Sequence, residues 1–434
     1  MLGVAFTIGV LLALTGGTDA RRCVAPEALV SRMLGQLEGS VSVTEPPNPS
    51  VLLAMNLAGG RDSDANKLLL RQIEEEAVKK AQGKMTSGQV ALYVLALLSS
   101  CQKPQQVQAL GQSIDLVRVL QQKTDEEVAS LETDGVPITS LFSVSLDALA
   151  LCLVQAGGYE SAAVALARQV LKPGNQISVD TRAMVVQALV CTYGHVDLQS
   201  VRDLLWKAVS TVTNDFLNEQ ERRKGQIGNI YSMGVALQAL ETSSKFYAPR
   251  EWDCAQAFNV VYNHDYHLPM AIAQVLPALV DKPYLQAASL DCTAHTRTSP
   301  DQDFSLSPSL ETSQDHKGTA APTLTATIEV HYSIINKLQG AHFNHSIQVE
   351  VPAGSTLLRV LKVAEEKEPD TFSFKTEQSS WGPMVVSIHG LAANPRDRTF
   401  WEFLSGKDAL EEGVGTYKPH DMEHITANFT KGIW

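Results

Sequence analysis

The chain has 434 residues, 44% of them hydrophobic, and carries a net charge of -12 at neutral pH. A chain of this length can form one large domain or two domains with separate cores. Binding to phosphates needs clustered Lys and Arg side chains, and no such cluster occurs, so the sequence argues against a nucleic-acid partner. No segment beyond the N-terminal one approaches the length of a membrane-spanning helix, so we expect no membrane insertion of the mature chain.

The first 20 residues, MLGVAFTIGVLLALTGGTDA, contain an apolar run that ends in small residues before Arg21 and Arg22. The run is too short for a comfortable membrane span and predicts a signal peptide, residues 1–20, cleaved near Ala20. We therefore expect a secreted, extracellular protein. An even number of cysteines in such a chain predicts disulfide bonds, although spacing alone does not choose the pairs. The six are Cys23, Cys101, Cys152, Cys191, Cys254 and Cys292.

One kind of helix recurs between Ala25 and Asp281. It begins with small polar residues or proline and continues as an almost wholly apolar run, and a helix that is apolar all round must be buried on all sides. Longer amphipathic segments, such as 64–81, 105–123 and 196–213, alternate with these helices. The alternation predicts a closed barrel of helical hairpins, with an apolar inner ring and an amphipathic outer ring. The six apolar segments begin at Asn48, Ser87, Ser143, Val179, Asn229 and Leu268.

The polar beginnings of the apolar helices are candidate binding groups. If the inner helices run in the same direction, their N-termini converge at one mouth of the barrel. For the segment ISVDTRAMVVQALVC an alternative is that Asp180 or Thr181 is a simple N-cap. Cys152 and Cys191 lie on successive inner helices, so a disulfide between them is also expected. The candidate groups at this mouth are Gln89, Asp180, Asn229, Ser232 and Gln274.

Residues 293–322 are rich in Ser, Thr, Pro and Asp and lack apolar periodicity, which predicts a flexible linker. From Leu324 onward the pattern is strand-like, with strands expected at 324–335 and 345–354, a helix at 355–367, and shorter strands in FSFKTE, MVVSIHG and HITANFT. The chain is therefore multidomain, with a smaller α+β domain over 323–434. This second domain carries two predicted glycosylation sites, Asn344 and Asn428.

Two Trp-bearing segments, 379–386 and 401–410, are expected outside the clear strands. A Trp in a small domain is usually part of the core, but beside Gly and Pro on a loop it can present a flat apolar surface to a ligand. A glycosidase needs two carboxylic acids, whereas the mouth offers one, Asp180, among amides. The nearest zinc-ligand types lie in Asp253-Cys254 and at His264 and His267, but disulfide pairing suits cysteines of a secreted chain better.

Several motifs in order, NPSVLLAMNLAG, VDTRAM, EWDCAQ, PMAIAQVLPAL, SSWG, FWEFLSG and EHITANFT, resemble the family of vertebrate cobalamin carriers, its gastric intrinsic factor branch most closely. The resemblance spans essentially the whole mature chain. It implies an α6/α6 barrel at 21–292 joined to the α+β domain, with cobalamin (vitamin B12) as a transported ligand between them and no catalysis. It also implies intestinal uptake through a cubilin-type endocytic receptor. The implied disulfides are Cys23–Cys254, Cys101–Cys292 and Cys152–Cys191.

The resemblance also implies which positions contact the corrin. Transcobalamins place a cobalt-binding histidine where this chain has Ile177, so no protein ligand to cobalt is expected. Asn229 replaces an aspartate of intrinsic factors, and the loop TSLFSVS departs from the family pattern. Alternatives are a secreted α6/α6 glycosidase, a protein-interaction module, or a more general plasma or mucosal cobalamin carrier. The implied positions are Gln89, Thr139, Ser140, Phe142, Ser143, Asp180, Asn229, Ser232, Gln274, Ser380, Trp381, Gly382, Pro383, Met384, Val385, Trp401, Glu402, Phe403, Leu404, Ser405, Gly406, Lys407, Asp408, Ala409 and Leu410.

Overall fold

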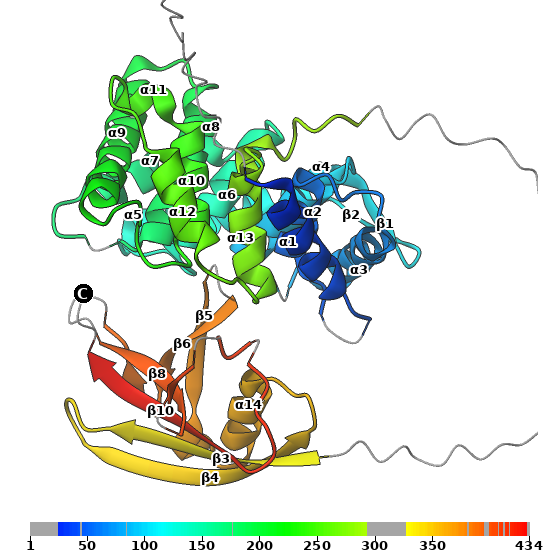
Figure 1. Cartoon of the computed structure of the whole chain (residues 1–434), viewed down its shortest axis with the longest axis vertical. Coiled ribbons are helices and arrows are strands. Elements are labelled where there is room, and N and C mark those ends of the chain that lie inside the picture. Colours follow the sequence, from blue (N-terminus) through cyan, green and yellow to red (C-terminus); the bar gives the residue numbers. More distant parts are fainter. Residues whose placement is uncertain are drawn as a thin grey trace, which may run out of the picture.

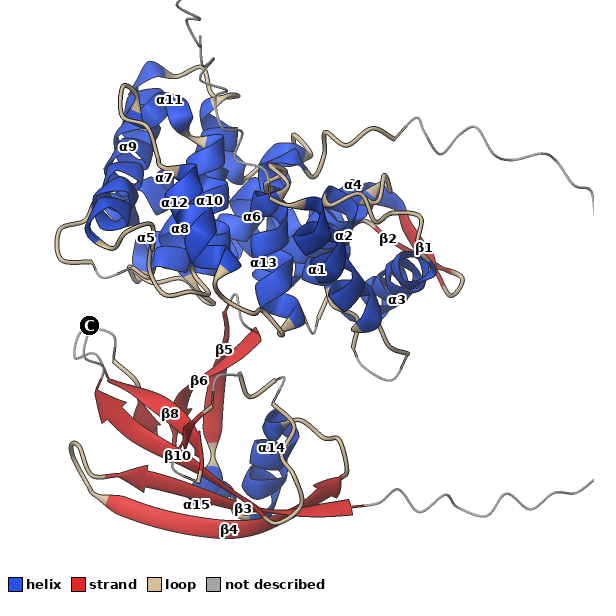
Figure 2. Ribbon diagram, in the orientation of Figure 1, coloured by secondary structure: helices blue, strands red, loops and turns tan. Residues whose placement is uncertain are grey.

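The computed structural model separates into a helical part and a smaller sheet-containing part (Figures 1 and 2). It describes residues 25–43, 46–83, 85–175, 177–292, 327–379, 382–394, 399–406, 408–410, 413–415 and 417–431. The predicted signal peptide and the predicted linker at 293–322 lie outside these residues, so both stay predictions. None of the described helices is long and apolar enough to cross a membrane.

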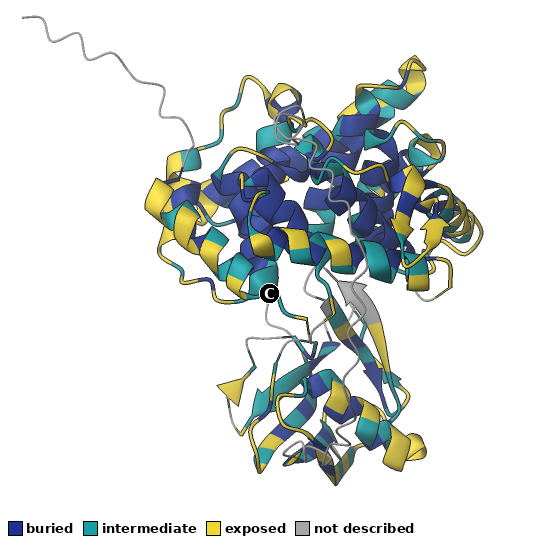
Figure 3. Ribbon diagram, turned by 90° about the vertical axis from the view of Figure 1, so that its right-hand side faces the viewer, coloured by how far each residue is buried: buried dark blue, intermediate teal, exposed yellow. Residues whose placement is uncertain are grey.

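Within the described residues, six nearly fully buried helices form a closed inner ring in which each contacts the next and the last contacts the first. Figure 3 shows buried residues gathered in the interior of the helical part. Their Ala- and Leu-rich sequences explain the arrangement, because small apolar side chains let neighbouring helices pack on every face. The predicted inner ring is confirmed. Its members are α2 (Pro49–Leu57), α4 (Ser87–Ser99), α6 (Leu141–Leu153), α8 (Val179–Tyr193), α10 (Met233–Thr242) and α13 (Pro269–Leu279).

The amphipathic helices lie outside this ring and pack one face against it. Where one outer helix was expected over 105–123, the structure instead has a short hairpin, β1 (Val107–Ala109) and β2 (Gln112–Ile114), before the helix begins. Leu110 and Gly111 both adopt positive φ angles, which a tight hairpin turn requires and a helix excludes. The outer helices are α1 (Glu27–Gly39), α3 (Asp64–Lys80), α5 (Leu116–Thr133), α7 (Tyr159–Leu171), α9 (Gln199–Arg222) and α12 (Cys254–Tyr262), with the short α11 (Ser244–Tyr247) after α10.

The inner helices begin at the same end of the barrel, which we call the mouth. Asn48 before α2 donates to Met270 of α13, at 2.9 Å between Nδ2 and Sδ. At the start of α4, a Cβ on Gly88 would lie 2.8 Å from the Cβ of Ser143 on α6, so only glycine fits this close approach. At the other end, Asn56 of α2 donates to Ser99 of α4. Neighbouring inner helices are therefore parallel, and the predicted convergence of their N-termini is found.

Disulfide bonds fasten the helical part at two described places. Cys152 and Cys191 join the ends of α6 and α8, and Cys101 joins Cys292 across 191 residues of sequence. Both pairs are those that the resemblance implies. Cys254 is also disulfide-bonded, and its expected partner, Cys23, lies outside the described residues.

The smaller part is built on a five-stranded sheet in the order β4-β3-β10-β8-β9, in which β10 and β3 are parallel and the other pairs are antiparallel. A second sheet, β5-β6-β7, lies beside it, and α14 (Leu357–Lys367) packs against β3 and β4. The strands are β3 (Thr327–Asn336), β4 (Phe343–Pro352), β5 (Phe374–Ser379), β6 (Gly382–Ile388), β7 (Leu391–Ala392), β8 (Thr399–Ser405), β9 (Asp408–Ala409) and β10 (Glu423–Lys431), and the short helix α15 (Pro369–Phe372) precedes β5.

Two segments of the smaller part bear on the site: residues 399–405, whose structure differs from the prediction, and the β5–β6 hairpin, which contacts the helical part. The Trp401 segment was expected outside the strands, but residues 399–405 form β8, which pairs with β10. Its sequence, TFWEFLS, is rich in the aromatic residues that favour strands but lacks a regular alternation of polar and apolar residues, so the strand was missed. The β5–β6 hairpin extends toward the barrel in Figure 1, and β5 contacts α6. The α6/α6 barrel followed by a smaller α+β unit, as predicted, is the observed fold.

Candidate functional site

Asp180 lies at the mouth, in the first turn of α8. The N-cap of this helix is Ser178, whose Oγ accepts from the Thr181 N–H at 3.2 Å, so the prediction that Asp180 or Thr181 caps the helix is wrong. Asp180 Oδ2 instead accepts from Ser232 Oγ at 3.2 Å, across the gap between α8 and α10. Its Oδ1 is buried and has no hydrogen-bond partner among the described residues. Asp180 therefore presents an acceptor that its own helix does not use.

The surroundings of Asp180 disfavour its charged form. Burial raises the pKa of Asp180 above its ordinary value, and the hydrogen bond from Ser232 opposes this shift. Ser232 is itself buried and held in place by Asn229, whose Oδ1 accepts from the N–H groups of Tyr231 and Ser232 at 2.9 Å each. The predicted group of Asp180, Asn229 and Ser232 is thus brought together, although these residues are up to 52 positions apart.

The other two predicted mouth residues, Gln89 and Gln274, make hydrogen bonds within the barrel itself. Gln89 completes a capping box of α4, in which its Oε1 accepts from the Thr86 N–H at 2.9 Å. This contact leaves the Gln89 amide nitrogen as the group that could meet a ligand. Gln274 is buried within α13, where its main-chain carbonyl accepts from Gln238 Nε2 at 2.7 Å.

The loop before α6 is anchored by a residue that the sequence did not single out. Glu127 of the outer helix α5 is buried and accepts from Thr139 Oγ1 at 2.6 Å, from the Thr139 N–H at 3.1 Å and from Ser87 Oγ at 3.0 Å. It thereby joins the start of α4 to the loop that carries Thr139. Ser140 caps α6 by accepting from the Ser143 N–H, and Phe142 packs against the core.

Ile177 immediately precedes Ser178 and is half-buried at the mouth. Its hydrocarbon side chain offers no atom that binds a metal. Among the described residues the only group of three potential metal ligands is Cys152, Cys191 and His195. Two of these three are joined in a disulfide, which removes the thiolates that a metal would need.

The predicted residues of the smaller part fall on two hairpins. On β6, Val385 is buried, whereas Met384 is 52% exposed. Ser380, Trp381 and Lys407 lie outside the described residues, and Gly382 is described only in its backbone.

The Trp401 side chain lies in the core of this part. It is 6% exposed, its indole Nε1 donates to the Leu391 carbonyl at 3.0 Å, and its ring packs 5.0 Å from that of Phe429. Strand alternation places Trp401, Phe403 and Ser405 on one face of β8 and Glu402 and Leu404 on the other. The predicted positions from Trp401 to Leu410 therefore do not share one surface. Beyond Ser405 the chain turns into β9, the edge strand of the five-stranded sheet, and Gly406, Asp408 and Ala409 are exposed.

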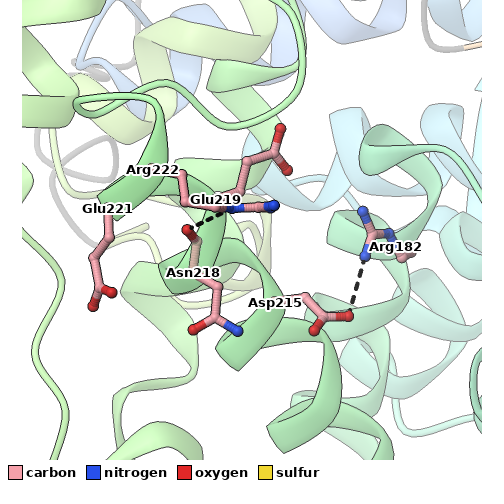
Figure 4. A pocket seen from close by; sticks show the side chains of 6 residues that line it. All are labelled: Arg182, Asp215, Asn218, Glu219, Glu221 and Arg222. Carbon is pink, nitrogen blue, oxygen red and sulfur yellow. Dashed lines mark hydrogen bonds and ion pairs between the residues drawn. The ribbon is translucent and has the colours of Figure 1, made fainter. Parts of the chain in front are cut away.

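A pocket of about 590 Å³ lies beside the mouth, between α8 and α9 (Figure 4). In it Arg182 faces Asp215 at 3.5 Å, and the guanidinium carbon of Arg182 lies 5.2 Å from the centre of the Phe216 ring. Burial lowers the pKa of Arg182, and the charges of Asp215 and Glu219 oppose that shift. None of the predicted cobalamin-contacting residues lines this pocket; its lining residues are Arg182, Asp215, Asn218, Glu219, Glu221 and Arg222.

Comparison with known proteins places the chain among relatives of similar length. The model of the family described as eukaryotic cobalamin-binding protein matches residues 5–311. The human protein named cobalamin binding intrinsic factor is 35% identical, over 97% of both sequences, and its dog counterpart is 36% identical over 94% of both. Human transcobalamin-1 is 31% identical over 88% of this chain and 87% of its own length.

A solved structure agrees with these sequence relationships. The crystal structure of haptocorrin in complex with Cbi matches 95% of this chain and 100% of its own chain, with a TM-score of 0.64 and 27% sequence identity. The likeness thus extends over the helical and the sheet-containing parts together. The chain belongs to the eukaryotic cobalamin-binding protein family.

Proposed function

We propose that this protein is a secreted, non-catalytic carrier that binds cobalamin between the mouth of its barrel and the hairpins of its smaller part. The observation that carries this proposal is the group of Asp180, Ser232 and Asn229 at the mouth, where a buried acceptor and an exposed amide stand together. Cobalamin has amide side chains around a flat apolar macrocycle. A buried acceptor favours an amide donor, since leaving such an acceptor unpaired costs free energy.

The apolar side of the vitamin would meet the hairpins. Met384 is an exposed flexible apolar side chain on β6, of the kind that adapts to an irregular ligand surface. Contact between β5 and α6 brings this hairpin to the helical part, which supports a site formed by both parts. Burial of a ligand between two parts slows its release, because the parts must separate before it leaves.

Several further features belong to the same proposal. Names of the relatives describe binding proteins, which favours a carrier over the glycosidase alternative. Delivery would use a cubilin-type receptor. Asn344 on β4 and Asn428 on β10 both pair with Ile335 of β3, so the two proposed glycans would stand on one face of the sheet.

Titration of the full chain with aquocobalamin tests the proposal. We expect uptake of one equivalent, followed by the visible spectrum of the corrin and by retention after gel filtration. Free cobalamin remaining at sub-equimolar addition would contradict the carrier function. Turnover of a glycoside substrate without cobalamin uptake would favour the enzyme alternative.

Replacing Ile177 by histidine tests the position of the cobalt. An imidazole at the mouth is expected to displace the cobalt-bound water of aquocobalamin and shift its visible spectrum, whereas the natural chain leaves the spectrum of the aquo form in place. Ile177→Leu is the matched control, because it changes the shape of the side chain without adding a ligand atom. Identical spectra for the histidine and leucine variants would place the cobalt elsewhere.

A further inference from the structure

Glu423, the first residue of β10, is hydrogen-bonded on both of its carboxylate oxygens. Its Oε1 accepts from Ser405 Oγ at 2.5 Å and from the Tyr417 hydroxyl, and its Oε2 accepts from the His420 N–H at 2.6 Å. The donors come from the end of β8 and from the loop before β10, while the carboxylate itself belongs to β10. One side chain therefore ties three segments together.

Main-chain contacts also hold the segments that Glu423 ties together, since β8 pairs with β10 along residues 399–405. The loop is fixed to the start of α14, where the Leu357 N–H donates to the Tyr417 carbonyl at 2.7 Å. On the other side, Ser405 begins the hairpin to β9, which continues through Gly406, whose N–H donates to the His424 carbonyl at 3.0 Å. β9 has only two residues. So short a strand contributes little by itself. The hairpin is held by the main-chain bond from the Leu410 N–H to the Phe403 carbonyl at 2.8 Å together with the side-chain contact at Ser405.

The electrostatics of the site agree with a charged Glu423. Burial alone would raise the pKa of Glu423, but the hydrogen bonds from Ser405, Tyr417 and His420 outweigh it and hold the pKa below its usual range, with the charge of His420 acting in the same direction. Of the other charged groups nearby, Asp408 pairs with Ser405 across the hairpin and Asp421 accepts from the Glu329 N–H, so neither takes the place of Glu423.

We propose that Glu423 is a positioning residue that holds the Ser405–Leu410 hairpin in its cobalamin-binding arrangement through Ser405 and Tyr417. This inference rests on the proposed function for its effect on the ligand. The hydrogen bonds of Glu423 with Ser405, Tyr417 and His420, which we call the clamp, are present in the ligand-free protein. Loss of the clamp releases the hairpin without removing any group that touches the vitamin.

Glu423→Gln is the principal test variant. It keeps the size of the side chain, but its amide nitrogen cannot accept from the His420 N–H and its single oxygen is uncharged. Hydrogen bonds to charged groups are the stronger ones, so we expect cobalamin to dissociate faster by on the order of tenfold, with association changed much less. Glu366→Gln is the matched control, because Glu366 lies in the same part and, among the described residues, its side chain makes one exposed ion pair, with Arg359.

Two readouts separate a positioning role from general stability. The dissociation rate of the natural protein is expected to rise as the pH falls below the ordinary Glu range and Glu423 becomes protonated, whereas the rate of Glu423→Gln stays flat over that interval. Tyr417→Phe is expected to have a smaller effect in the Glu423→Gln background than alone, since both changes remove the same contact. Tyr417→Phe also serves alone if Glu423→Gln does not fold.

Hydrogen exchange of the ligand-free protein tests, independently of cobalamin, whether Glu423 holds the hairpin. Faster exchange at residues 404–410 in Glu423→Gln, with the helical part unchanged, supports the inference. Exchange equal to that of the natural protein overturns it. If the natural protein takes up no cobalamin, the proposed function fails, while the exchange result still decides whether Glu423 holds the hairpin.

Discussion

Replacing Asp180 by alanine is expected to weaken cobalamin binding by about 10- to 100-fold without destabilising the ligand-free protein. Asp180 Oδ1 is buried at the mouth without a hydrogen bond from the described residues, so a ligand amide would supply its missing donor. A hydrogen bond to a charged or strongly polar group is worth roughly 1.5–3 kcal/mol, which sets the expected loss of affinity. Competition with labelled cobalamin measures it.

The sign of the stability change distinguishes a binding residue from a structural one. In the free protein Asp180 is desolvated and its pKa is raised, so alanine removes an unfavourable burial together with the single bond from Ser232. We therefore expect the thermal midpoint of the free Asp180→Ala protein to be unchanged or higher. Asp180→Asn keeps an acceptor and is expected to bind more tightly than Asp180→Ala. A lower midpoint with unchanged affinity would show that Asp180 serves the fold alone.

Replacing Asp147 by asparagine is expected to stabilise the protein at pH 7 by about 2–4 kcal/mol. Asp147 is fully buried in α6, and neither carboxylate oxygen has a hydrogen-bond partner among the described residues. Burial raises the pKa of Asp147 well above its ordinary value, and the charge of Glu127 raises it further, while the charge of Lys123 opposes the shift. A neutral asparagine of nearly the same shape avoids the cost of keeping this carboxyl group protonated in the folded chain at pH 7.

The pH dependence of this effect follows from the direction of the shift. Below about pH 4 Asp147 is protonated in the folded and the unfolded chain, so it contributes no difference. As the pH rises, the unfolded chain loses this proton while the folded chain retains it, and stability falls. The advantage of Asp147→Asn should thus appear at pH 7 and vanish near pH 4 in denaturant unfolding. Asp125→Asn, at an exposed position of α5, is the control. An equal gain at both pH values would contradict a buried acid as the cause.

The inner ring of the barrel was predictable because its signal is local and strong. Helices such as α4 and α6 are apolar on every face, and only burial on all sides accommodates them. The hairpin at 107–114 was missed because its apolar residues happen to fit helical spacing. The turn at Leu110 and Gly111 requires positive φ angles, and a leucine in the sequence does not indicate such an angle.

The location of the candidate site could be predicted from the sequence, but most of its individual hydrogen bonds could not. Convergence of the helix N-termini brought Asp180 and Ser232 together, yet the role of Ser178 as the cap was hidden because Asp180 and Thr181, close after it, are also possible caps. Glu127 and Glu423 carry no sequence signal, since each is one acid among many on an amphipathic helix or a strand end. Their importance comes from partners 40 and 18 positions away, which only the folded chain brings near.

Hydrogen exchange of the full chain with and without cobalamin tests the central claim most directly. If the vitamin is bound between the two parts, one equivalent should slow exchange together at 178–182 and 229–233 in the barrel mouth and at 383–388 and 404–410 in the hairpins. The opposite end of the barrel, where Asn56 contacts Ser99, should be unaffected. Protection confined to one of the two parts, or no protection at stoichiometric cobalamin, would contradict a site formed by both.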